Sequence, residues 1–282
     1  MSITVDLNGK VAAVTGGGGV LCSLMAKALA DSGAKVAVLD LRQDAAQAVV
    51  DEINAAGGTA IGVACNVLEK ESLTEASMAI SAALGPVDIL INGAGGNRPE
   101  ATTSVEFHEP DLDTEDDAIK TFFDLDPNAV DFTFKLNFLG TLLPTQVFAK
   151  HMAKAGSGVI INISSMNAFT PLTKIPAYSG AKAAISNFTQ WLAVHFSHAG
   201  IRVNALAPGF FLTDQNRSLL TNEDGSPTAR GGKIVSQTPM GRYGDPEELL
   251  GTMLWLASDD ASGFVTGTVI PVDGGFAAYS GV

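Results

Sequence analysis

The stretch KVAAVTGGGGVL, residues 10–21, decides the fold that the sequence predicts. Valine and alanine run without alternation up to Thr15, which is typical of a strand buried on both faces of a sheet. An apolar helix is expected from Val20 to Ser32, and four consecutive glycines fill the turn between the two elements. Glycines there let backbone amides approach a pyrophosphate, and the start of the helix adds partial positive charge. This context favours a phosphate-binding turn over a purely structural one.

The same alternation of buried strand and helix continues along the chain. Further strands are expected at 35–40, 59–64, 87–92, 158–164, 202–207 and 268–272. Further helices are expected at 42–55, 69–84, 177–199 and 246–258, together with a long helix that ends at about residue 154. Glycines that could cap helices in a left-handed conformation follow the expected helix ends at Gly33, Gly57, Gly85, Gly156 and Gly200. Short connections between strands and helices predict right-handed crossovers. We therefore expect one α/β domain over residues 1–282, a Rossmann-type doubly wound parallel sheet of about seven strands flanked by helices.

Two segments, 95–128 and 208–246, are too long to be simple connections. The first holds seven acidic residues between Glu106 and Asp117, and the simplest interpretation of that run is a solvated surface. Loops of this length are usually lids or binding loops. Both segments follow the carboxyl ends of strands, where open α/β sheets bind ligands.

Composition and charge limit the class of function. The chain has 282 residues, 46% hydrophobic and 17% charged, which is typical of a folded protein. A net charge of −13 argues against nucleic acid as a partner, because that partner needs a basic surface. No apolar run approaches the ~20 residues of a membrane helix, and the N-terminus lacks a secretion signal. Cys22 and Cys65 are far apart, so we expect a reducing, cytoplasmic location, no disulfide and no metal site.

An acidic residue, Asp40, ends the second expected strand. An acid at this point can accept hydrogen bonds from the ribose hydroxyls of adenosine, and it repels a 2′-phosphate. Arg42 lies close by and could weaken that discrimination. We expect NAD as the cofactor, with NADP less favoured.

A serine, a tyrosine and a lysine form a second motif. Ser165 follows an expected strand, Tyr178 comes 13 residues later, and Lys182 lies four residues further on in an expected helix. Because residues four apart share a helix face, the lysine ammonium should favour the phenolate and lower a tyrosine pKa that is ordinarily about 10. The serine hydroxyl can hold a substrate oxygen. Beside a hydride acceptor, this set would form an alcohol–ketone redox site.

Taken together, these motifs resemble the short-chain dehydrogenase/reductases, and the resemblance covers nearly the whole chain. The glycine turn corresponds to the family's TGxxxGxG, the sequence NGAG at 92–95 to its NNAG, and VDGG at 272–275 to its C-terminal signature. The residues that match the family's catalytic tetrad are Asn137, Ser165, Tyr178 and Lys182. The positions that depart from the pattern are Val20 and Cys22, where glycines are usual, Gly93, where asparagine is usual, and Asn66, where aspartate is usual.

The resemblance implies a role for each residue. Tyr178 would be the general acid/base, Lys182 would lower its pKa and hold the nicotinamide ribose, and Ser165 would orient the substrate oxygen. Asn137 would hold a water that relays protons to Lys182, and Thr213 would contact the nicotinamide carboxamide. The cofactor contacts that the resemblance implies are Gly16, Gly18, Gly19, Val20, Leu21, Asp40, Leu41, Asn66, Val67, Asn92, Gly93, Ala94, Tyr178, Lys182, Pro208, Gly209 and Thr213.

Within that family the chain is most similar to the short-chain-type D-mannonate oxidoreductases, also called fructuronate reductases. The similarity is carried by FFDLD at 122–126, SMNAF at 165–169, PLTKIP at 171–176 and FFLTDQNR at 210–217. It implies hydride transfer between NAD(H) and a sugar acid, interconverting D-mannonate and D-fructuronate in hexuronate catabolism. Such a substrate needs a cation and several hydrogen-bonding groups. The candidate substrate contacts are Asn97, Arg98, Asn167, Lys174, Gln215, Asn216 and Arg217, with Lys174 and Arg217 the first choices for the carboxylate.

Two alternatives stay open. The same chemistry could act on another alcohol or ketone, such as a sugar alcohol, a steroid-like alcohol or a 3-oxoacyl thioester. A non-catalytic dinucleotide-binding module is the alternative from a different class, and the complete tetrad argues against it. The resemblance also implies a homotetramer or homodimer, because in relatives the helix after Tyr178 and the helix with Asn137 pack across a two-fold axis.

Overall fold

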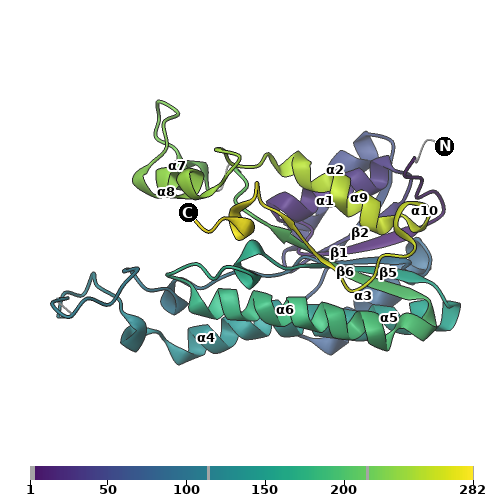
Figure 1. Cartoon of the computed structure of the whole chain (residues 1–282). Helices are drawn as coiled ribbons and strands as arrows, with labels where there is room; N and C mark the ends of the chain where they lie inside the picture. The colour runs from purple at the N-terminus through teal and green to yellow at the C-terminus, as the bar shows by residue number, and fades with distance from the viewer. Residues whose placement is uncertain (1–3, 113–114, 214–215, 282) are drawn as a thin grey trace.

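A parallel sheet of seven strands forms the centre of the protein (Figure 1). The computed structural model describes residues 4–112, 115–213 and 216–281. The strands are β1 (Val11–Thr15), β2 (Lys35–Asp40), β3 (Thr59–Ala64), β4 (Ile89–Asn92), β5 (Gly158–Ile163), β6 (Ile201–Pro208) and β7 (Val269–Val272), in the order β3-β2-β1-β4-β5-β6-β7. Because the order reverses between β1 and β4, the sheet is doubly wound and the predicted fold class is confirmed. A doubly wound sheet binds its ligands at the carboxyl ends of the strands beside that reversal.

Helices cover both faces of the sheet (Figure 1). One face packs against α1 (Val20–Asp31), α2 (Gln43–Ala55) and α9 (Leu250–Ala257), and the other against α3 (Lys70–Ala83), α5 (Gly140–Ala155) and α6 (Pro176–His195). Successive residues of a strand point to opposite faces, so Val14 enters the first core and Ala13 the second. Two buried faces explain why the central strands are apolar without alternation.

The expected boundaries of the strands agree with the structure to within two residues. The five glycines expected as helix caps all have positive φ, between +68° and +113°, as only glycine adopts at low cost. Three helices differ from expectation, and one of them, expected over 246–258, begins as a 3₁₀ turn at Pro246–Leu249 before α9. The helix expected up to about residue 154 is divided into α4 (Pro127–Phe134), a π-helical turn at Lys135–Leu139, and α5. The helix expected over 177–199 ends at His195, and a 3₁₀ turn at Ser197–Ala199 follows.

The two long segments lie at the same end of the molecule, beyond the carboxyl ends of the strands (Figure 1). Before α4 begins, the described residues of segment 95–128 form two short 3₁₀ turns, at Pro99–Ala101 and Phe122–Asp124. Segment 208–246 contains two helices that the sequence did not predict, α7 (Arg217–Leu220) and α8 (Ala229–Gln237). The other short elements are 3₁₀ turns at Met166–Ala168, Pro246–Leu249 and Phe276–Ala278, and α10 (Asp259–Ser262). Across the described ranges, we find no helix with the length and apolar character that a membrane crossing requires.

Candidate active site

The glycine turn is shaped by close contact with neighbouring strands and α2. Gly16 has φ +64°, and a β-carbon there would lie 2.9 Å from the Cα of Ala94. A β-carbon on Gly18 would lie 2.7 Å from the Cβ of Ala45. Gly19 is the N-cap of α1 and provides no side-chain hydrogen bond to the helix. The first amides of α1 therefore have no side-chain cap and can receive an anion, which fits a pyrophosphate.

Asp40 points toward this turn from the end of β2. Its two carboxylate oxygens accept hydrogen bonds from the backbone amides of Gly18 and Arg42, each at 3.1 Å. The next residue, Leu41, is 70% exposed, so it offers an apolar surface beside the carboxylate. The geometry fits the adenosine half of a dinucleotide.

Two departures from the family pattern occupy the same space. A β-carbon on Gly93 would lie 2.2 Å from the Sγ of Cys22, so the thiol fills the volume that a side chain at position 93 would need. Cys22 is buried, and burial is the main reason that its pKa is raised to about 11. The thiol is therefore neutral at physiological pH and serves as a small packing group.

The side-chain amide of Asn92 connects β4 to neighbouring elements. Its Nδ2 donates hydrogen bonds to Thr145 Oγ1 at 3.0 Å and to Asn162 Oδ1 at 2.9 Å, and its side chain is buried. These bonds join β4 to β5 and α5, whereas the Oδ1 of Asn92 is buried without a hydrogen-bond partner. The expected contact between Asn92 and the cofactor stays a prediction. Thr15 holds the adjoining backbone, since its Oγ1 accepts the amides of Gly93 and Ala94 at 3.1 and 3.3 Å.

In the loop after β3, the side-chain amide of Asn66 forms hydrogen bonds with neighbouring residues. Its Nδ2 donates to Glu69 at 2.8 Å, and its Oδ1 accepts the amide of Leu68 at 3.1 Å. Val67 is buried against Gly140, where a β-carbon would come within 3.1 Å of its Cγ2. Asn66 and Val67 therefore form part of the loop that follows β3.

Ser165, Tyr178 and Lys182 come together beyond the end of β5, as the sequence predicted. Ser165 is the N-cap of the 3₁₀ turn at Met166–Ala168 and is buried. Tyr178 lies in the first turn of α6, near enough to Ser165 for the serine hydroxyl to affect its pKa. Lys182 is only 4% exposed, and its Nζ lies 5.5 Å from the centroid of the Tyr178 ring. Its Nζ donates to the carbonyl of Ile163 at 2.8 Å, which fixes the ammonium at the end of β5.

Burial shifts both titratable groups of this cluster toward their neutral forms. The pKa of Tyr178 is raised by desolvation, and the hydrogen bond with Ser165 acts in the opposite direction. Desolvation lowers the pKa of Lys182 to about 8. The sequence had predicted a lowered pKa for Tyr178; the net shift is upward, because burial penalises the phenolate more than the hydrogen bond stabilises it. At neutral pH the phenol therefore carries its proton.

Asn137 is buried completely in the π-helical turn between α4 and α5. Its Nδ2 donates to the carbonyls of Gly96 at 2.7 Å and Thr133 at 2.8 Å. A β-carbon on Gly95 would lie 2.6 Å from Asn137 Oδ1 and 3.3 Å from Lys182 Nζ. Asn137, Gly95 and Lys182 are therefore neighbours. A single π turn inserted in a helix is a feature that often marks functional sites.

Pro208 ends β6, and Gly209 and Thr213 follow it. The amide of Gly209 donates to Val272 at 2.9 Å, and a β-carbon there would lie 2.6 Å from the Cα of Asp273. The amide of Thr213 donates to Asn216 Oδ1 at 2.8 Å, which orders the start of the long segment.

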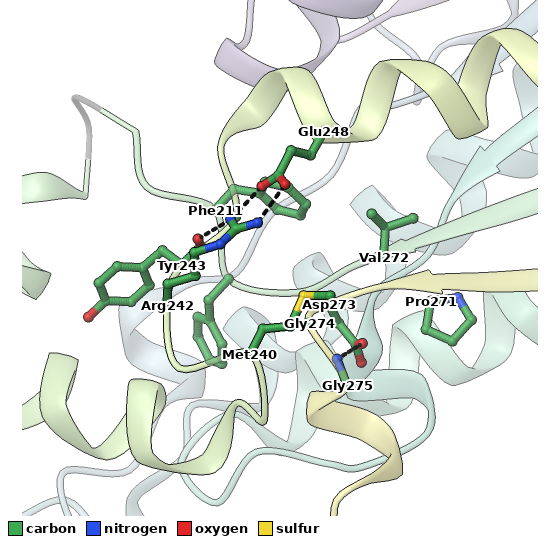
Figure 2. A pocket seen from close by; sticks show the side chains of 12 residues that line it. Phe211, Met240, Arg242, Tyr243, Glu248, Pro271, Val272, Asp273, Gly274 and Gly275 are labelled. Atoms are coloured by element: carbon green, nitrogen blue, oxygen red, sulfur yellow. Dashed lines mark hydrogen bonds and ion pairs between the residues drawn. The ribbon is translucent and has the colours of Figure 1, made fainter.

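A pocket of about 330 Å³ lies beside the ends of β6 and β7 (Figure 2). Arg242 points across it and forms two hydrogen bonds with Glu248, each at 2.7 Å. The hydrogen bond from Arg242 is the main reason that the pKa of Glu248 is lowered to about 2. Because the arginine charge is neutralised within the pocket, this cavity is not suited to bind a substrate carboxylate.

A second pocket, of about 530 Å³, lies between the two long segments and residues 170–175. Lys174 lines it, as expected for a substrate contact, and its Nζ donates to the carbonyl of Ser104 at 2.7 Å. The sequence analysis missed three charged residues of its lining, Glu106, Arg230 and Lys233. The last two lie on α8, which carries no motif that could have indicated them.

The remaining candidate substrate residues that the structure describes do not line this second pocket. The guanidinium of Arg98 lies 4.2 Å from the ring centroid of Phe132, and Asn97 donates to Thr102 at 2.8 Å. Arg217 is exposed at the start of α7, and Gln215 lies outside the described residues. Asn167 is 4% exposed and its Oδ1 has no hydrogen-bond partner, so a polar group is available two residues after Ser165.

Metal ligands do not gather in the described part of the chain. Within residues 4–112, 115–213 and 216–281, no cluster of three or more His, Cys, Asp or Glu side chains could hold a metal ion. His195 instead stacks on Trp191, with ring centroids 4.6 Å apart.

Comparison with known protein families agrees with this geometry. A sequence profile described as short chain dehydrogenase matches residues 10–224. The chain belongs to the short-chain dehydrogenase family. The resemblance that the motifs carried is thereby confirmed.

Several relatives of this short-chain dehydrogenase match it over nearly their whole length. An uncharacterised oxidoreductase of Haemophilus influenzae is 58% identical over 277 residues, which cover 98% of this chain and 96% of the relative. The uncharacterised oxidoreductase UxuB of Bacillus subtilis is 56% identical over 277 residues, covering 98% of each protein. A crystal structure of a candidate D-mannonate oxidoreductase from Haemophilus influenzae with bound NAD is 59% identical, covers 98% of both chains and has a TM-score of 0.93.

Proposed function

We propose that this short-chain dehydrogenase is an NAD-dependent oxidoreductase that interconverts D-mannonate and D-fructuronate. The observation that carries the proposal is the convergence of Ser165, Tyr178 and Lys182 beyond β5, next to Gly95 and Asn137. The similarity to a candidate D-mannonate oxidoreductase with bound NAD supports the choice of substrate and cofactor. The predicted single catalytic domain over residues 1–282 is part of the proposal.

The chain offers a complete set of groups for a dinucleotide. The uncapped start of α1 and the close-packed glycine turn would receive the pyrophosphate. Asp40 and Leu41 would hold the adenosine ribose and adenine, and the carboxylate of Asp40 favours NAD over NADP. Lys182 would hold the nicotinamide ribose, and Thr213 the carboxamide. Bound NADH supplies the hydride for the carbonyl carbon of D-fructuronate.

Tyr178 supplies the proton for the reduction. Its raised pKa keeps the phenol protonated at neutral pH, which is the form required to protonate a ketone oxygen. As the carbonyl carbon accepts the hydride, the carbonyl oxygen takes the Tyr178 proton and becomes the new hydroxyl. Ser165 orients that oxygen, and the ammonium of Lys182 stabilises the phenolate that remains. Asn137, beside Lys182, would hold a water that relays a proton back to Lys182. Oxidation of D-mannonate reverses the hydride and proton transfers.

The charge of the pocket between the long segments fits an anionic substrate. Its lining has three cations, Lys174, Arg230 and Lys233, against the single carboxylate of Glu106. In a protein of net charge −13, a local excess of positive charge favours entry of a carboxylate. Asn167, with its unpartnered oxygen, is our proposed contact for a substrate hydroxyl.

We also propose that the protein acts in the cytoplasm as a homodimer or homotetramer. Cys22 and Cys65 are both free, which fits a reducing compartment. On α6, Trp191 is 56% exposed and Val194 is 77% exposed. Large apolar side chains exposed on one helix support an interface with another copy.

The rate of NADH oxidation with D-fructuronate tests the proposed function. We expect turnover with NADH, much slower turnover with NADPH, and little with D-fructose or a 3-oxoacyl thioester. The Tyr178→Phe variant is the control for adventitious oxidation. Binding of NADH without turnover of D-fructuronate, or faster turnover of a neutral ketone or thioester, would contradict the proposal.

A further inference from the structure

The carboxylate of Glu106 lies where an anionic ligand would meet the cations of the pocket between the long segments. Its Oε1 is 2.9 Å from the Nζ of Lys233, and both residues line that pocket with Arg230 and Lys174. The hydrogen bond and charge of Lys233 lower the pKa of Glu106, and the more distant charge of Lys174 adds to the shift. The pocket therefore already holds one carboxylate, supplied by the protein itself.

The ion pair joins the two long segments across the pocket. Glu106 belongs to segment 95–128, and Lys233 lies on α8 in segment 208–246. The side chain of Lys233 is 70% exposed and that of Glu106 is 33% exposed, so water and salt screen their attraction. A pair of this kind is weak enough for a second carboxylate to replace one partner.

The cations of the pocket differ in the partners that they already bind. Lys174 is bound to the carbonyl of Ser104, and Lys233 is bound to Glu106. Arg230 lies three residues before Lys233 on the same helix, and among the described residues it forms no hydrogen bond or ion pair. Residues three apart share a helix face, so Arg230 and Lys233 can approach one carboxylate together. A guanidinium and an ammonium give such a ligand a bidentate partner and a point charge.

We propose that Arg230 and Lys233 bind the carboxylate of the substrate, and that Glu106 occupies this position until the substrate replaces it. This inference rests on the proposed function, because it assumes an anionic substrate. Glu106 acts as an internal competitor: its release from Lys233 accompanies binding of the sugar acid, and its return accompanies release of the product. Arg230 and Lys233 determine specificity for an acid over a neutral sugar.

Charge-neutral variants separate this proposal from a purely structural ion pair. The test measures the Kd of D-mannonate for the protein saturated with NADH, by calorimetry, so that no turnover is needed. Glu106→Gln keeps the shape of the side chain and removes the competing charge, and it should lower the Kd by about threefold to tenfold. Lys233→Gln and Arg230→Gln should each raise it by about tenfold. Glu75→Gln, an exposed residue of α3, is the matched charge control and should leave the Kd unchanged.

The direction in which Glu106→Gln changes the Kd of D-mannonate shows whether Glu106 competes with the substrate. If the ion pair only holds the two segments in place, the variant binds D-mannonate more weakly, and that result overturns the proposal. An unchanged Kd in Glu106→Gln, or in both Lys233→Gln and Arg230→Gln, also overturns it. Should Glu106→Gln fail to fold, as judged by circular dichroism, the two α8 variants alone decide. Failure of the wild type to reduce D-fructuronate refutes the proposed function instead, since the binding comparison is independent of turnover.

Discussion

Replacing Lys182 by methionine should stabilise the protein without cofactor while abolishing its turnover. Lys182 is 4% exposed, and burial lowers its pKa from 10.5 to about 8. At ~1.4 kcal/mol per pKa unit, keeping this lysine charged in the folded state costs about 3 kcal/mol at neutral pH. Methionine also loses the hydrogen bond to Ile163, which contributes about 1 kcal/mol. The expected net gain in the free energy of unfolding is therefore about 2 kcal/mol at pH 7.

The gain should depend on pH in a defined direction. Between about pH 8 and pH 10.5 the unfolded chain holds the Lys182 proton while the folded protein has lost it. The stability of the wild type therefore rises through this window, relative to a variant that lacks the group. Below pH 8 the full cost is present. Above pH 10.5 the cost has vanished, so the difference between variant and wild type shrinks and then favours the wild type.

Urea unfolding of both proteins without cofactor, at pH 7 and pH 10, measures this difference. Comparing variant with wild type at each pH removes the contributions of the other titrating groups. If the variant is less stable than the wild type at pH 7, or if the difference in stability does not change with pH, then burial of the Lys182 charge does not destabilise the folded protein. The turnover of Lys182→Met with D-fructuronate and NADH is measured in parallel.

Three further single variants and one double variant test other parts of the site. Gly93→Ala should destabilise the protein by about 1–3 kcal/mol in urea unfolding, because the new β-carbon would meet the Sγ of Cys22 at 2.2 Å. Adding Cys22→Gly should recover part of that loss and not all of it, since the Thr15 carbonyl would still lie 2.8 Å from the β-carbon. Asp40→Ser should raise the ratio of kcat/KM for NADPH over NADH by about tenfold, ~1.4 kcal/mol, and an unchanged ratio would remove Asp40 from the ribose site. Asn137→Asp replaces a donor to two carbonyls by an acceptor, so it should lower both kcat and the urea midpoint, and an unaltered protein would contradict the buried geometry.

Much of the fold could be predicted because local residues determine it. Glycines at positive φ follow five helix ends, and the strands buried on both faces are apolar at most of their positions. Ser165, Tyr178 and Lys182 could be predicted for the same reason: Tyr178 and Lys182 are four apart on α6, and Ser165 comes two residues after the end of β5. Asn137 came only from the family resemblance, and the π-helical turn around it was not predicted, since nothing in its sequence distinguishes it from an α-helix.

The parts that the sequence did not predict depend on contacts between distant segments. Glu106 and Lys233 are 127 residues apart, and each alone is a charged residue in a long loop or a short helix. Cys22 and Gly93 look like independent departures from the family pattern, and only their contact in space shows that one makes room for the other. Asn92 is expected from the family pattern to contact the cofactor, and only the structure shows that its Nδ2 binds Thr145 and Asn162 in the core. The pKa of Tyr178 was predicted in the wrong direction, because spacing shows a nearby ammonium and not the extent of burial.

In the proposed reaction, the phenol of Tyr178 carries the proton that accompanies the hydride. Rapid mixing of D-fructuronate with the NADH complex of Tyr178→Phe, beside the wild type, measures that step. We predict a Kd for NADH close to that of the wild type and a hydride-transfer rate lower by roughly 10²–10⁴-fold. Hydride transfer at the wild-type rate in this variant would contradict the account.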